Sequence, residues 1–98
     1  MSLPVVFLRA ARTEYDDAID WYEARQVGRG ARFSAAVGRV LTRIADQPQL
    51  YAEVFDTVRE APVARYPYCV YYREEAGQLV VLSVFHTSRD PSVWQGRV

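Results

Sequence analysis

Residues 78–86, QLVVLSVFH, decide how this chain folds, because their side chains are apolar almost throughout. A short run that is rich in Val, Leu and Phe is typical of a β-strand. A strand with one face in water alternates between apolar and polar residues, whereas a continuously apolar strand is buried on both faces. We therefore expect residues 78–86 to form a strand at the centre of a sheet.

Two further strands are expected just before this one. Residues 68–74 are rich in Tyr and Val, and residues 57–66 precede them. The segment EEAGQ, residues 74–78, contains Gly77 and is typical of a hairpin turn. Strands that follow one another through short turns predict an antiparallel meander, which here ends in an irregular or weakly helical tail over residues 90–98.

The first half of the chain has helical spacing instead. Residues 12–26 place four apolar or aromatic side chains on one stripe of a helix, namely Tyr15, Ala18, Ile19 and Tyr22. Thr13 is expected to cap the start of this helix. Three acidic residues are expected to favour the positive end of its dipole: Glu14, Asp16 and Asp17.

A second helix is expected over residues 31–46, and Pro48 should end it. Its apolar stripe is continuous and comprises Phe33, Ala36, Val37, Val40, Leu41 and Ile44. Between the two helices, Gly28 and Gly30 are expected to break the helical pattern. Two amphipathic helices joined by so short a connection predict an antiparallel helical hairpin.

The order of these elements predicts the fold. Residues 4–9 should form a first strand, with Pro4 at its start. The chain therefore reads βααβββ and forms one domain over residues 1–98. Its fold class is α+β, with an antiparallel helical hairpin packed on one face of a small, mostly antiparallel sheet.

Composition argues against several kinds of function. The formal net charge is zero, with 12 basic and 12 acidic residues, so nucleic-acid binding through many phosphates is disfavoured. Cys69 is the only cysteine, so the chain has neither a disulfide nor a cysteine-based metal cluster, and we expect no cofactor. No apolar run is long enough to span a membrane and no signal peptide is recognisable, so we expect a cytoplasmic protein with no membrane partner.

Several segments together carry a resemblance to a known family. They are YDDAIDWYEAR at 15–25, RFSAAVGRVLTRIADQPQLY at 32–51, VREAPVARYPYCVYYR at 58–73 and VVLSVFHTSRDPSVWQGR at 80–97. In this order and spacing the chain resembles the RelE/ParE superfamily of bacterial toxins. The resemblance implies the toxin of a type II toxin–antitoxin, or plasmid stabilisation, system. It also implies a cognate antitoxin as partner, with a flexible segment that wraps the toxin and holds it inactive.

The superfamily has two branches with different chemistry. RelE-like toxins cut mRNA on the ribosome, and ParE-like toxins poison DNA gyrase. RelE-like nucleases commonly carry an arginine after a tyrosine on the middle strand of the meander. Here Cys69 follows Tyr68, and a thiol cannot hold a phosphate. The chain therefore resembles the ParE branch more closely, and the implied target is DNA gyrase. A RelE-like ribonuclease, with the ribosome and mRNA as partners, is the alternative, and a non-toxic binding module of this fold is a third hypothesis.

A ribonuclease would need a base, a cation for the phosphate and an acid. The candidates are His86, Arg89, Arg65 and Arg59, which a shared sheet edge would bring together. In a purely structural interpretation, which we favour, His86 ends its strand and bonds a backbone group, and Arg89 pairs with a carboxylate. Two aromatic residues, Trp21 and Trp94, are candidates for binding a partner, although intramolecular packing explains both of them as well. We expect the partner surface to be apolar and to lie near the tail or the helical hairpin, where a helix could dock or a strand could be added.

Overall fold

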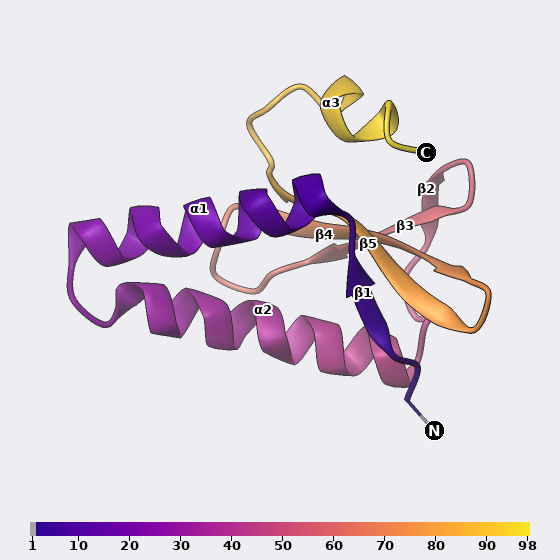
Figure 1. Cartoon of the computed structure of the whole chain (residues 1–98), viewed down its shortest axis with the longest axis horizontal. Helices are drawn as coiled ribbons and strands as arrows, with labels where there is room; N and C mark the ends of the chain where they lie inside the picture. The colour runs from indigo at the N-terminus through magenta and orange to yellow at the C-terminus, as the bar shows by residue number, and fades with distance from the viewer. Residues whose placement is uncertain (1) are drawn as a thin grey trace.

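The computed structural model describes residues 2–98. Its elements in chain order are β1 (Val5–Phe7), α1 (Arg9–Arg25), α2 (Arg29–Asp46), β2 (Glu53–Phe55), β3 (Val58–Pro62), β4 (Tyr68–Glu75), β5 (Gln78–His86) and α3 (Ser92–Gln95). The strands form one sheet in the order β1-β5-β4-β3-β2, in which β1 is parallel to β5 and the other pairs are antiparallel. Figure 1 shows α1 and α2 lying antiparallel to each other and the short α3 apart from them. The predicted α+β class and the helical hairpin on the sheet are confirmed.

β5 is an interior strand, as its apolar sequence predicts. It pairs with β4 along its whole length and with β1 through Leu79, Val80 and Val81. The middle position of the five strands belongs to β4, because β2 adds a strand that the sequence analysis missed. β2 has only three residues, all of them exposed, so it has no apolar pattern by which it could be recognised.

The prediction for the start of α1 was wrong. α1 begins at Arg9 instead of residue 12, so Thr13 lies inside the helix, and the N-cap is Leu8, whose side chain makes no capping hydrogen bond. The first turn contains no acidic residue. The helix starts early because the Leu8 backbone N–H donates to Val81 O of β5, which directs the chain from β1 straight into α1, and because Ala11 is fully buried there.

Gly28 and Gly30 have different roles. Gly28 has a φ of +90° and is the N-cap of α2, so it breaks the helical pattern as expected. Gly30 instead lies within α2, where a Cβ atom would be 2.8 Å from Ile19 O of α1, so the close approach of the two helices requires a glycine. Glu23 of α1 supplies the missing cap, since its carboxylate accepts hydrogen bonds from the backbone N–H groups of Gly28 and Gly30 at 3.0–3.1 Å. α2 ends at Asp46, just before Pro48, as predicted.

The meander is shorter than predicted at its first strand. β3 ends at Pro62 instead of residue 66, and a turn that includes Arg65, with a φ of +72°, leads to β4. The turn between β4 and β5 consists of Ala76 and Gly77, both with positive φ, which is the geometry of a tight hairpin.

The sheet is covered on both faces. The face toward α1 and α2 carries the main core, to which β5 contributes Leu79, Val81 and Val84. Three other residues of β5 face the opposite side and form a second cluster with α3, and the alternation shifts by one residue at the irregularity in the β4–β5 pairing: Val80, Leu82 and Phe85. The tail is thus weakly helical, as expected, and its packing explains why β5 is apolar on both faces. No helix within residues 2–98 is long and apolar enough to cross a membrane.

Candidate functional site

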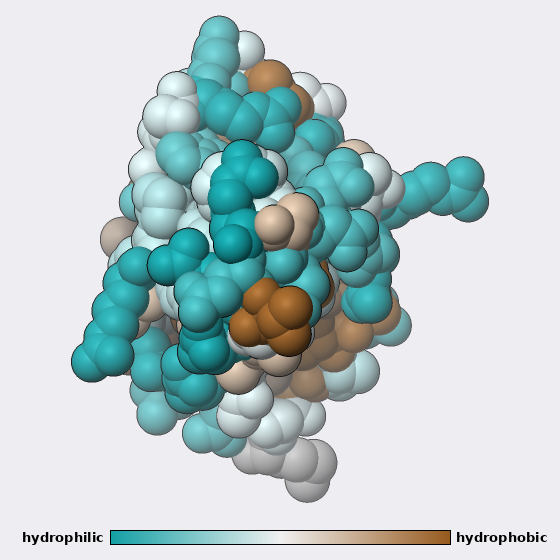
Figure 2. Space-filling view, turned by 90° about the vertical axis from the view of Figure 1, so that its left-hand side faces the viewer, coloured by the Kyte–Doolittle hydropathy of each residue, from teal (hydrophilic) through white to brown (hydrophobic). Residues whose placement is uncertain are grey.

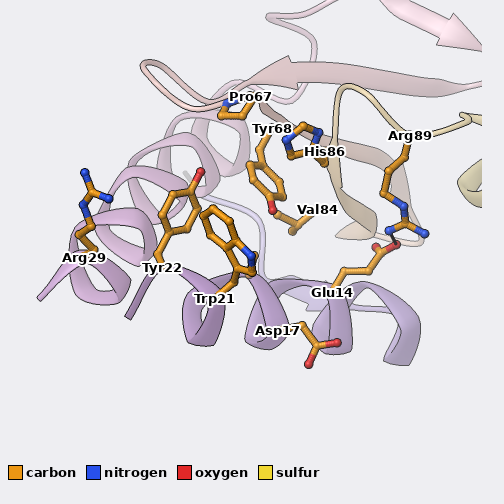
Figure 3. A pocket seen from close by; sticks show the side chains of 11 residues that line it. Glu14, Asp17, Trp21, Tyr22, Arg29, Pro67, Tyr68, Val84, His86 and Arg89 are labelled. Atoms are coloured by element: carbon orange, nitrogen blue, oxygen red, sulfur yellow. Dashed lines mark ion pairs between the residues drawn. The ribbon is translucent and has the colours of Figure 1, made fainter. Parts of the chain in front are cut away.

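A groove of about 650 Å³ lies between α1 and the end of the sheet at which β4 begins and β5 ends. We call it the Trp21 groove. Figure 3 shows its two walls, with Trp21 and Tyr22 on α1 facing Tyr68 and His86 on the sheet. The remaining residues that line it are Glu14, Asp17, Ala18, Arg29, Pro67, Val84 and Arg89.

Trp21 is the dominant apolar side chain of this groove. It is 51% exposed, although its ring contacts the Tyr22 ring edge-on at a centroid distance of 5.1 Å. The Arg25 guanidinium lies 4.0 Å from the Trp21 ring centroid. In Figure 3 the indole points toward the sheet, while Asp17 points away from it. A large aromatic side chain that remains half-exposed in an apolar groove is the kind of residue that anchors a protein partner.

The opposite wall is built by a cross-strand pair. Tyr68 of β4 lies opposite His86 of β5, and their rings meet edge-on at 5.1 Å. Burial raises the pKa of the Tyr68 and Tyr22 hydroxyls, so both phenols are neutral at physiological pH. The two tyrosines therefore offer ring faces and edges to a ligand instead of charge.

His86 ends β5, and its ring is held by the next turn of the chain. Its Nδ1 accepts a hydrogen bond from the Ser88 backbone N–H at 3.1 Å and lies 2.7 Å from Ser88 Oγ. Arg89 is 3.8 Å from a Glu14 carboxylate oxygen, and its guanidinium lies 4.7 Å from the Phe85 ring centroid. Both side chains thus have the contacts that the purely structural interpretation expects.

The other two ribonuclease candidates lie elsewhere. Arg59 of β3 is opposite Tyr72, whereas His86 is opposite Tyr68. These positions are four residues apart along β4, which is about 13 Å at the rise of a strand. Arg59 is also engaged, since it donates to Tyr51 O at 2.6 Å and lies 3.9 Å from Glu53. Arg65 does not line the Trp21 groove but lines a second groove that adjoins it. The four candidates do not share one sheet edge.

Cys69, which follows Tyr68 where RelE-like nucleases commonly carry an arginine, is 7% exposed and belongs to the cluster under α3. Burial is the main cause that raises the pKa of its thiol, so the thiol is neutral. Within residues 2–98, no group of three or more His, Cys, Asp or Glu side chains is placed to hold a metal ion.

Trp94, the second candidate for partner binding, is 2% exposed. Its ring stacks on Tyr71 at 4.1 Å with an interplanar angle of 17°, and Phe55 meets it edge-on at 5.8 Å. A partner could contact Trp94 only after α3 had left the sheet. The two tryptophans therefore differ: Trp21 is presented in a groove and Trp94 is covered.

Comparison with known proteins identifies the family. The model of the ParE toxin of type II toxin–antitoxin systems, parDE, matches residues 5–91. The chain belongs to the ParE toxin family. The matched residues contain every strand and both long helices, and the resemblance to the ParE branch is confirmed.

The fold of this ParE-like toxin is also found among solved structures. A chain of the chromosomal ParDE TA system from P. aeruginosa superimposes with a TM-score of 0.66 at 17% sequence identity. The match covers 87% of this toxin and 96% of that chain. No curated protein sequence matches the toxin. As the toxin of a type II system, it has an antitoxin as its partner.

Two features of the site escaped the sequence analysis. Glu14 was assigned to a helix start but lines the Trp21 groove, where it holds Arg97 of the tail. The arginines of α2 are the second feature. The spacing of Arg29, Arg32 and Arg39 places them on one side of a helix, which is a signal in the sequence that they lie together.

Proposed function

We propose that this ParE-like toxin inhibits DNA gyrase and does not cut mRNA, and that its antitoxin blocks it by occupying the Trp21 groove. The proposal places its action in the bacterial cytoplasm, where gyrase works. It has two parts, a target and an inhibitor site, which are supported by different observations.

The observation that supports a protein target is the separation of the four ribonuclease candidates. In-line attack by a 2′-hydroxyl needs the base and the phosphate-binding cations within hydrogen-bond reach of one phosphodiester. Arg59 is held near β2, Arg65 belongs to another groove, and Cys69 is a buried neutral thiol. Only His86 and Arg89 lie in one groove, and both already have intramolecular partners.

The support for the inhibitor site is the chemistry of the Trp21 groove. It is open and largely apolar, and it lies between α1 and the sheet near the tail. A helix of the antitoxin with an apolar face would bury Trp21 against Tyr22 and Tyr68. Such a buried aromatic cluster usually carries a large share of the binding free energy of an interface.

The target is tested by two assays on purified toxin. Addition of toxin to DNA gyrase should stop ATP-dependent supercoiling of relaxed plasmid, and addition of its antitoxin should restore supercoiling. Addition of toxin to translating ribosomes should leave the mRNA intact. Codon-specific cuts that disappear in His86→Ala or Arg89→Ala would instead establish the ribonuclease alternative. Normal growth of bacteria at high expression without antitoxin would favour a non-toxic binding module.

A further inference from the structure

A second groove, of about 610 Å³, adjoins the Trp21 groove and has a different character. Its lining includes four arginines, which are Arg29, Arg32, Arg39 and Arg65. The other lining residues are Tyr22, Ala35, Ala64 and Tyr66, so no acidic residue of the described part of the chain lines this groove. We call it the arginine groove. Figure 2 looks onto the hairpin end of the molecule, which is mostly hydrophilic, with long hydrophilic side chains projecting from it.

Among the described residues, these four arginines form no ion pair with a carboxylate, whereas five other arginines of the toxin do. Arg12, Arg59, Arg73, Arg89 and Arg97 all form ion pairs with carboxylates. Within residues 2–98, none of the four arginines of the groove forms an ion pair, and all four are exposed. No carboxylate of the described residues therefore lies within ion-pair distance of their guanidinium groups, which are accessible to a ligand.

The positions of these arginines work against the stability of the fold. Arg29 is the first residue of α2 and Arg32 lies in its first turn, where the positive end of the helix dipole disfavours cations. Arg65 has a φ of +72°, a conformation that is strained for a residue with a side chain. The carboxylate of Glu23 in the hairpin turn forms no ion pair with them and instead accepts the backbone hydrogen bonds that cap α2. Unfavourable placements that converge on one groove indicate a binding role.

The two grooves are continuous, since Tyr22 and Arg29 line both of them. A partner that crosses them meets an apolar section around Trp21 and then a cationic section. We propose that the arginine groove binds an acidic segment of the antitoxin, and that this segment directly adjoins the apolar segment held by Trp21. This inference rests on the proposed role of the Trp21 groove and adds the chemistry of the partner.

A protein segment fits the grooves better than a nucleic acid strand. Asp17 lines the Trp21 groove and forms no ion pair within residues 2–98, so its charge would repel a phosphate backbone that continued from the arginine groove. The net charge of zero also disfavours a nucleic acid that binds through many phosphates along its length. A peptide can place its carboxylates against the arginines alone and its apolar side chains against Trp21.

The probe for this inference is a short oligoglutamate peptide, with oligoglutamine and a single-stranded oligouridylate of equal charge as comparisons. Oligoglutamate should bind the toxin at low ionic strength, and added salt should weaken this binding. Oligoglutamine should not bind. In the variant that carries both Arg32→Gln and Arg39→Gln, oligoglutamate should bind at least about tenfold more weakly. Arg9→Gln removes an exposed arginine that lines neither groove and should leave binding unchanged.

A titration with the antitoxin separates this inference from the proposal on which it rests. Weaker antitoxin binding by both Trp21→Ala and the double arginine variant supports both the proposed antitoxin site in the Trp21 groove and the acidic segment in the arginine groove. Weaker binding by Trp21→Ala alone overturns the acidic segment and leaves the Trp21 groove in place. Tighter binding of oligouridylate than of oligoglutamate, or no binding of oligoglutamate, also overturns the inference, while the gyrase assay is unaffected. Because the substituted arginines are exposed, unchanged circular dichroism should verify the fold of each variant.

Discussion

Arg97 donates hydrogen bonds from both of its terminal nitrogens to the Glu14 carboxylate, at 2.9 and 3.0 Å, across 83 positions of sequence. The side chains of both residues are mostly buried, with 18% and 13% exposed. Ser83 Oγ donates to Glu14 Oε1 at 2.7 Å, and Arg97 also donates to Leu82 O at 2.9 Å. This network holds the tail against α1. It also gives a hydrogen-bond donor to the Leu82 carbonyl, which lies on β5 just past the residues that pair with β1.

Arg97→Ala should lower the free energy of unfolding by about 1.5–3 kcal/mol, because it removes charge-assisted hydrogen bonds and leaves Glu14 poorly compensated. Asp16→Ala is the control, since it breaks the exposed Arg12–Asp16 pair and should cost less than about 1 kcal/mol. Urea denaturation measures both values. Equal effects of the two substitutions would mean that the tail is not held by this network.

The close contact of the two long helices depends on Gly30. Gly30→Ala would place a Cβ atom 2.8 Å from Ile19 O and should destabilise the toxin by about 1–3 kcal/mol, as overpacking does. A Cβ atom on Gly38 of the same helix would meet no neighbouring atom within 4 Å, so Gly38→Ala should stabilise the toxin by about 0.5–1 kcal/mol. Thermal denaturation of this pair compares the two sites directly, and the same sign for both would refute the tight contact.

Trp94 is large and buried, yet its indole Nε1 has no hydrogen-bond partner among the described residues. Trp94→Ala removes the stacking on Tyr71 and should cost about 3–5 kcal/mol. Trp94→Phe keeps much of the apolar contact and also removes the unpaired N–H group, so its cost should stay below about 1.5 kcal/mol. Denaturant unfolding distinguishes the two variants. A Phe variant as unstable as the Ala variant would show that the indole has a polar role.

Unlike Trp94, Trp21 should contribute little to the stability of the toxin and much to antitoxin binding. Trp21→Ala removes a half-exposed side chain and should change the free energy of unfolding by less than about 1 kcal/mol. The same substitution should weaken antitoxin binding by at least about tenfold, because an aromatic anchor in a groove contributes strongly to an interface. Calorimetric titration with the antitoxin measures the affinity. Wild-type affinity in this variant would place the antitoxin elsewhere.

Alkaline pH should destabilise the toxin through its sheet tyrosines. Burial raises the pKa of Tyr68, Tyr71 and Tyr72, and at Tyr71 the hydrogen bond to Glu60 adds to the effect. Because the folded-state values exceed the unfolded value of roughly 10, this stabilisation is complete below that pH and is lost as the pH rises through the folded-state values.

Unfolding experiments between neutral and strongly alkaline pH test this expectation. The free energy of unfolding should decline with pH above about 10, where unfolded tyrosines release protons that the folded ones retain. Tyr71→Phe removes one such group and should make the decline less steep. An unchanged slope in this variant would mean that Tyr71 ionises equally in both states.

The sequence determined the helices and the strands of the meander because hydrophobic periodicity reports which side of an element meets a core. QLVVLSVFH became an interior strand, and the apolar stripe of residues 31–46 became the buried face of α2. Family membership could also be recognised, since residue types recur at fixed spacing along nearly the whole chain.

The predicted element boundaries were wrong where a contact with backbone far away in the sequence decides the local structure. α1 begins early because Leu8 donates to Val81, and Gly30 is needed within α2 because Ile19 O leaves no room for a side chain. Neither contact has a local signal. β2 forms because Glu53 and Phe55 pair with β3, although their own side chains are exposed.

The sequence by itself thus determined the long helices, the strands of the meander, the fold class and the family of this toxin, because each depends on local periodicity or on residue types at fixed spacing. Only the tertiary structure decided which candidates lie together. It placed Trp21 in an open groove and Trp94 under α3, and it separated Arg59 from His86. The physical reason is that a binding site consists of side chains from different elements, and their distances depend on how those elements pack.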